Sequence, residues 1–185
     1  MLHFQSASLR LDLLAEVWYN ITKKGGVNIV KNRLEFIAKR FSNHHISLSK
    51  DNNLLEIFNP YGSENITVEY VPDDEWTPYI LYFAFQHWHL NDEEDIIEHI
   101  IDIVEGNIFS IEFFENDIRC FGGDIEAQEL QELSYETLEQ YTGYYGITQL
   151  KEIIDSFKVR GWKTDANFDA KLIIDEFGNV TIQKV

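Results

Sequence analysis

Residues 79–114 read YILYFAFQHWHLNDEEDIIEHIIDIVEGNIFSIEFF, and this stretch decides the expected fold. Residues 79–90 are rich in aromatic side chains and predict one long strand. The isoleucines of residues 92–104 then recur at helical spacing, with Asn91 or Asp92 as N-cap and Gly106 as C-cap. Residues 108–114 return to a strand pattern, so the stretch predicts a strand, a helix and a second strand.

Residues on either side extend this mixture of helices and strands. Upstream, residues 8–21 and 30–41 have helical spacing around Gly25-Gly26 and predict a helical hairpin, followed by strands at 46–48, 54–58 and 66–71. Downstream, residues 108–114 and 118–121 predict a hairpin that Gly122-Gly123 closes. The last segment predicts a helix capped at Ser134, a helix that carries Leu150, Ile153, Ile154 and Phe157, and a hairpin at 171–174 and 180–185.

Short connections between the strands favour antiparallel pairing. We therefore expect an α+β fold, with a mainly antiparallel sheet, an N-terminal helical hairpin and further helices packed on the sheet. The length of 185 residues fits a single domain, 1–185. The alternative is that residues 134–185 form a semi-independent C-terminal lobe.

Charge is the most informative global property of this chain. The formal net charge is -17, made up of +5 in residues 1–50, -21 in residues 51–160 and -1 in residues 161–185. A field this negative repels nucleic acid and anionic membranes, and it attracts a basic protein partner. Improved solubility is the simpler explanation of the same charge.

The sequence also favours a cytoplasmic location. Cys120 is the only cysteine, so an internal disulfide is excluded. The N-terminal residues lack the pattern of a signal peptide, and the apolar runs are too short to span a membrane.

Two groups of residues are candidates for chemistry. His87 and His89 alternate in the predicted strand and could face one metal ion, with Glu98 or His99 as a third ligand. No metal-binding motif accompanies them, and a solvated histidine pair is the simpler interpretation. Cys120 alternates with Ile118 and is predicted to be a buried core thiol. We expect no enzyme activity and no cofactor.

Acidic and aromatic residues make up the candidate binding site. Asp73, Asp74 and Glu75 precede Trp76 and Tyr79, so aromatic anchors lie beside carboxylates, as in many interface hot spots. Asp92, Glu93 and Glu94 form a second acidic run, which helix capping also explains. The alternative for Trp76 is that its ring folds back onto the core.

Part of the chain resembles immunity proteins of bacterial polymorphic toxin systems. The resemblance covers residues 82–90, the acidic-capped helix that follows, the IEFF run at 111–114 and Phe121-Gly122-Gly123. It implies a small cytoplasmic protein that binds and blocks one toxin domain, without catalytic residues. Many such toxins are basic nucleases, which an acidic inhibitor would suit.

The leading hypothesis is therefore a non-enzymatic inhibitor of a cognate toxin. A metal-dependent hydrolase that uses His87 and His89 is the second hypothesis. The third is an oligomerising module, in which the basic N-terminal hairpin of one subunit meets the acidic body of another. The sequence leaves the oligomeric state open.

Overall fold

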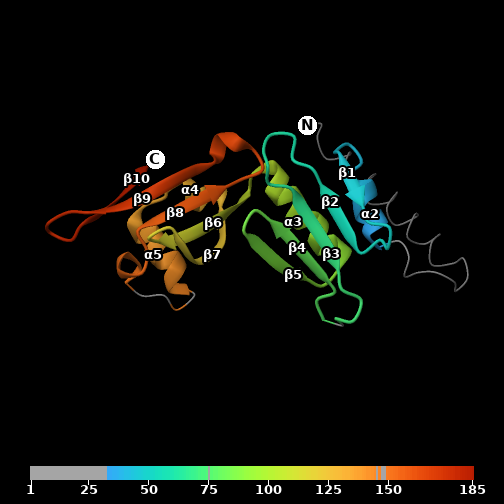
Figure 1. The fold of residues 1–185 in the computed structure, drawn as a ribbon, viewed down its shortest axis with the longest axis horizontal. Helices are drawn as coiled ribbons and strands as arrows, with labels where there is room; N and C mark the ends of the chain where they lie inside the picture. The colour runs from blue at the N-terminus through green and yellow to red at the C-terminus, as the bar shows by residue number, and fades with distance from the viewer. Residues whose placement is uncertain (1–32, 75, 145, 147–148) are drawn as a thin grey trace, which may run out of the picture. The chain divides into compact units, whose positions relative to one another are not determined.

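The computed structural model describes residues 33–74, 76–144, 146 and 149–185. Within these ranges the strands form two five-stranded antiparallel sheets (Figure 1). Sheet A has the order β1-β2-β3-β4-β5, with strands at Ile46–Leu48, Leu54–Ile57, Ile66–Tyr70, Tyr79–Phe83 and Gln86–Leu90. Sheet B has the order β10-β9-β8-β6-β7; in chain order, β6 to β10 are Ile108–Glu115, Ile118–Glu126, Ser156–Arg160, Phe168–Ile174 and Val180–Lys184.

The described helices are α2 to α5 and two short 3-10 turns. They span Arg33–Arg40, Glu93–Glu105, Ala127–Gln131, Tyr135–Tyr144, Leu150–Glu152 (η2) and Thr164–Ala166 (η3). This mixture confirms the predicted α+β class. Of the predicted N-terminal hairpin, the second helix includes α2, whereas the first helix, at 8–21, lies outside the described residues. No helix in the described part of the chain has the length and apolar character needed to cross a bilayer.

Sheet A buries one face against α2 and α3. The strand residues alternate strictly, so that Val68, Leu81 and Phe83 point into the core while their neighbours point outward. The helices contribute apolar residues at helical spacing, namely Leu34 and Ile37 from α2 and Ile96, Ile100 and Ile103 from α3. Trp162, which follows β8 of sheet B, completes this core and is only 1% exposed.

Helix α3 begins and ends where the sequence predicts. The Asp92 carboxylate accepts hydrogen bonds from the backbone N–H groups of Glu94 (3.0 Å) and Asp95 (2.9 Å). Gly106 closes the helix with a φ of 86°, in the left-handed region that glycine adopts without strain.

The single long strand predicted at 79–90 is wrong. The chain turns at Ala84-Phe85, so β4 and β5 pair as a hairpin in which Tyr79 faces Leu90 and Phe83 faces Gln86. Ala84 adopts a φ of 50° at this turn. Glycine or asparagine normally occupies such a position, so the sequence carries no turn signal here.

Gly122 and Gly123 do not close the β6–β7 hairpin, contrary to the prediction. Both lie inside β7, opposite Glu112 and Ile111 of β6. A Cβ atom at Gly123 would collide with the Tyr141 hydroxyl, and one at Gly122 would lie 2.9 Å from the Ile111 carbonyl oxygen. These glycines therefore serve the close approach of neighbouring groups rather than a turn.

The C-terminal segment is partly as predicted. The Ser134 hydroxyl accepts from the Thr137 N–H (3.2 Å) and caps α5, and β9 pairs with β10 as the closing hairpin. The helix predicted to carry Leu150, Ile153, Ile154 and Phe157 is wrong, because only η2 is helical and Phe157 lies in β8. Phe157 and Val159 are both fully buried at strand spacing, and this alternation decides the local structure.

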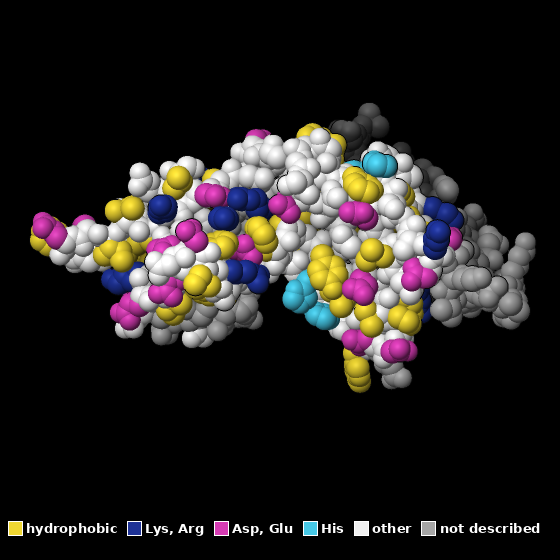
Figure 2. Space-filling model, viewed as in Figure 1, with side chains coloured by type: hydrophobic (Ala, Val, Ile, Leu, Met, Phe, Trp, Pro, Cys, Tyr) yellow, Lys and Arg dark blue, Asp and Glu magenta, His cyan; other side chains and the backbone are white. Residues whose placement is uncertain are grey.

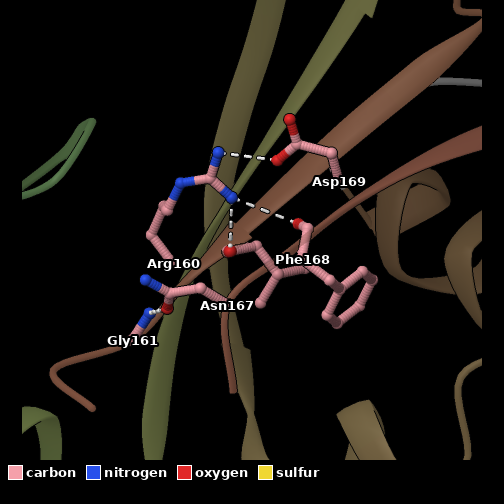
Figure 3. A network of polar contacts seen from close by, with 6 residues as sticks. Arg160, Gly161, Asn167, Phe168 and Asp169 are labelled. Carbon is pink, nitrogen blue, oxygen red and sulfur yellow. Dashed lines mark hydrogen bonds and ion pairs between the residues drawn. The ribbon is translucent and has the colours of Figure 1, made fainter. Parts of the chain in front are cut away.

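Arg160 holds the end of β8 in place (Figure 3). Its guanidinium donates to the carbonyl oxygens of Val159 (2.8 Å) and Phe168 (3.2 Å) and to the Asp169 carboxylate (2.6 Å). The next residue, Gly161, donates its N–H to the Asn167 side chain (2.7 Å). These bonds fix the chain just before Trp162, whose carbonyl oxygen accepts from the Asn59 amide (2.8 Å).

Candidate partner-binding surface

Antiparallel pairing brings the two acidic runs to one end of sheet A. Tyr79 opens β4 and faces Leu90, the last residue of β5. The loop at 71–78 therefore meets the sheet where Asn91 and Asp92 leave it.

Asp74 makes several hydrogen bonds to the residues that follow it in this loop. Its carboxylate accepts from the N–H groups of Thr77 (2.9 Å) and Trp76 (3.0 Å) and from the Thr77 hydroxyl (3.1 Å). These bonds lower the pKa of Asp74, and the bond from the Thr77 N–H contributes most. The Val71 N–H donates to the Pro78 carbonyl (2.7 Å) and closes the base of the loop.

Trp76 projects from this loop into solvent. It is 84% exposed, the largest value among the exposed large apolar residues in the described ranges. The alternative that its ring folds back onto the core is therefore wrong. The backbone N–H of Trp76 is hydrogen-bonded to Asp74, so the residue that carries the exposed ring is tied to this carboxylate.

The side chains of Tyr79 and Glu93 bond to each other within the fold. Tyr79 is fully buried, and its hydroxyl donates a short hydrogen bond to the Glu93 carboxylate. Burial raises the pKa of Tyr79 well above its ordinary value, and the hydrogen bond to Glu93 raises it further. The Arg33 guanidinium lies 3.8 Å from Glu93 and 5.4 Å from the centre of the Tyr70 ring. This cluster ties α2 and α3 to sheet A, and Tyr79 presents no surface to a partner.

The remaining candidate residues differ in how free they are. Asp73 and Glu94 are exposed, whereas the exposed Asp92 uses its carboxylate to cap α3. Glu75 lies outside the described residues. Among the described candidate residues, Asp73, Trp76 and Glu94 are therefore the ones with exposed side chains that no cap or hydrogen bond described above uses.

Charge alone does not single out this loop. Figure 2 shows Asp and Glu side chains spread over the visible face of both halves, with one group of histidines at the β5 edge of sheet A. The predicted concentration of anions along residues 51–160 thus becomes a dispersed pattern on that face. The loop is distinguished by an exposed tryptophan beside carboxylates.

His87 and His89 lie on the same exposed side of β5, as predicted, with ring centres 5.3 Å apart. His87 also lies 6.0 Å from the ring of Tyr82, whose hydroxyl donates to Glu69 (3.1 Å). His99 packs on Trp88, at 5.1 Å, and Trp88 points to the opposite side of β5. His99 therefore does not join the pair, and the described residues hold no group of three or more potential metal ligands.

Cys120 is exposed, so the predicted buried thiol is wrong. The pairing of β6 with β7 shifts here, because Phe113 faces Phe121 while Phe114 faces Arg119. Cys120 is the extra residue of this bulge and falls out of the alternation on which the prediction relied.

Sequence reasoning missed a buried carboxylate in β6. Glu112 is 1% exposed and lies 2.5 Å from the guanidinium of Arg119, which is about half exposed. Burial raises the pKa of Glu112, and Arg119, Lys158 and Arg160 partly offset this effect. Three of the four Lys and Arg residues in the acidic segment 51–160 thus surround one buried anion. A glutamate within the apolar run IFSIEFF was the available signal.

A hollow of about 510 Å³ lies beside α4 and α5. Carboxylates form much of its wall, and its lining is Asp124, Ile125, Glu126, Glu129, Glu132, Leu133, Thr137, Gln140 and Tyr141. The Glu129 carboxylate already accepts one hydrogen bond, from the Glu126 N–H (3.2 Å). A wall of this composition suits a cationic group rather than an anion.

The described residues form an α+β fold with an exposed tryptophan beside carboxylates. No family model, curated protein or solved structure matches this chain.

Proposed function

We propose that this chain is a protein-binding protein that meets a basic partner through the loop at 72–78 and the first turn of α3. In keeping with the resemblance to immunity proteins, the partner is a toxin domain, and the chain neutralises it by occupying its surface. The observation that carries this proposal is Trp76, 84% exposed and hydrogen-bonded through its backbone N–H to Asp74.

The energetics of this arrangement favour binding. A large aromatic side chain that moves from water into a partner's pocket is the commonest kind of hot spot, and its truncation costs about 2 kcal/mol or more. The backbone N–H groups of Trp76 and Thr77 are already hydrogen-bonded to Asp74, which reduces the conformational entropy that these two residues lose on docking. Asp73 and Glu94 supply exposed carboxylates that steer a cationic surface toward the loop.

The partner to test is the C-terminal toxin domain that the gene immediately upstream would encode, as the resemblance to immunity proteins implies. Co-expression of the intact chain should restore the growth of cells that produce this domain. Trp76→Ala should weaken binding in titration calorimetry by about 30-fold or more. Asp73→Lys combined with Glu94→Lys should slow association and reduce its dependence on salt. Asp74 is left intact, because its replacement would disturb the loop itself.

Phe177→Ala is the matched control. Phe177 is an aromatic residue, 81% exposed, beside Asp175 and Glu176 in the β9–β10 turn. This variant should bind as the unmodified chain does. The proposal is contradicted if the upstream domain is not bound, or if Trp76→Ala binds as tightly as the unmodified chain.

A further inference from the structure

Strand β10 forms an edge of sheet B in the described residues, with β9 on one side only. The Asp175 N–H donates to the Asn179 carbonyl (3.0 Å), and the Val185 N–H donates to the Asp169 carbonyl (2.8 Å). The alternation of an antiparallel ladder therefore directs the backbone groups of Thr181 and Gln183 toward β9. The N–H and C=O groups of Val180, Ile182 and Lys184 point outward.

The other sheet edges are less suited to pairing. Strand β1 has three residues, and β7 contains the bulge at Cys120. Strand β5 lies against sheet B, where the Phe85 carbonyl accepts from Arg119 (3.1 Å). Strand β10, VTIQK, has neither proline nor a shift in its pairing, and it carries a single charge. Edges without such protection are templates for another strand.

The surroundings of β10 also favour self-association. Residues 171–185 contain two lysines and two acidic residues, so this hairpin is locally neutral in a chain of net charge -17. Ile173 and Ile174 of β9 are 44% and 51% exposed. A second copy approaching here meets a partly apolar surface of zero net charge, where the repulsion between two acidic chains is reduced.

We propose that β10 pairs antiparallel with β10 of a second copy, with Ile182 facing Ile182 across the twofold axis. In this register Val180 faces Lys184, and every outward backbone group of Val180, Ile182 and Lys184 finds a partner. The two five-stranded sheets B become one continuous sheet. The contact is isologous, so one strand supplies both halves of the interface.

The charges agree with this register. Lys184 of each copy faces Val180 of the other and so lies beside the turn that precedes Val180. That turn carries Asp175 and Glu176. The two lysines lie at opposite ends of the paired strands, so they do not face each other.

The test is sedimentation of the full chain over a range of concentrations. The unmodified protein should show a monomer–dimer equilibrium. Ile182→Pro removes an N–H that points away from β9, so the internal ladder stays intact, and dimerisation should weaken about tenfold or more. Ile182→Ala keeps the N–H and should weaken dimerisation less. Near-ultraviolet circular dichroism of each variant checks the fold.

A cross-link tests the register. In a Cys120→Ser background, Ile182→Cys should form a covalent dimer under mild oxidation, because facing residues of this type have Cα atoms about 5.5 Å apart. Thr181→Cys should cross-link poorly, because in this register Thr181 faces Gln183 of the second copy rather than its own counterpart. A chain that stays monomeric at all concentrations overturns the proposal. A dimer that is unaffected by Ile182→Pro, or that cross-links equally at both positions, overturns it as well.

Discussion

Sheets A and B have the same number of strands but differ in what they bury. The core of sheet A, with α2 and α3, consists of aliphatic and aromatic side chains. The buried polar residues in the described ranges, Ser110, Glu112 and Thr142, all belong to the sheet B half. The core of sheet A is thus dominated by apolar contacts, with the hydrogen bond from Tyr79 to Glu93 beside them, whereas an inner strand of sheet B carries a buried carboxylate.

The largest expected effect tests whether the two sheets are independent. Trp162 follows β8 of sheet B, but its ring packs in the sheet A core, 6.3 Å from the ring of Phe83. Trp162→Ala should lower the stability of sheet A by about 3–5 kcal/mol, through lost burial and the cavity left behind. Hydrogen exchange measures this loss in the amides of β4, with those of β6 as the internal comparison.

We expect β6 to lose less protection than β4. If protection falls equally in both strands, the two cores unfold as one unit. The two sheets then differ in the residues that they bury but not in stability.

A smaller effect concerns the packing of sheet B. Gly123→Ala places a methyl group where the Tyr141 hydroxyl lies, so the ring or β7 must shift. The expected loss is about 1–3 kcal/mol, measured by urea denaturation. Gly143→Ala is the control, because nothing lies within 4 Å of a Cβ at that position. Equal stability of Gly123→Ala and the unmodified chain would contradict this account of the glycine.

The smallest effect is a pH dependence. Burial raises the pKa of Glu112 in the folded chain, so protonation of this carboxyl favours folding. The resulting stability is fully present below the unfolded pKa and is lost as the pH rises through the folded one. As the pH falls from about 7 to about 4, the unmodified chain should therefore gain stability relative to Glu112→Gln. Urea denaturation of both proteins across this range checks the sign, and a constant difference would contradict it.

Local signals in the sequence predict part of this fold well. Asp92 and Gly106 mark the ends of α3 because capping depends on adjacent residues alone. The turn at Ala84 could not be predicted, since the pairing of β4 with β5 imposes a backbone conformation that alanine does not favour. Gly122 and Gly123 resemble turn residues, and their role depends on Tyr141 and Ile111, which are distant in sequence.

The candidate surface likewise combines features that the local sequence predicts with features that depend on distant contacts. The sequence identifies Trp76 and its acidic neighbours, but it does not reveal which of them are free. Asp74 and Glu93 use their carboxylates in hydrogen bonds that the fold creates. The buried position of Glu112 depends on strands that flank β6 from both sides, which a linear pattern does not show.

The position of Trp162 has a consequence for synthesis on the ribosome. All five strands of sheet A lie within residues 46–90, and α3 ends at Glu105. These segments emerge well before residue 162, so the nascent chain holds an incomplete apolar interior while more than fifty further residues are being added. The N-terminal sheet reaches its final packing only after β6, β7 and β8 have been translated, which makes its maturation late despite its early position in the chain.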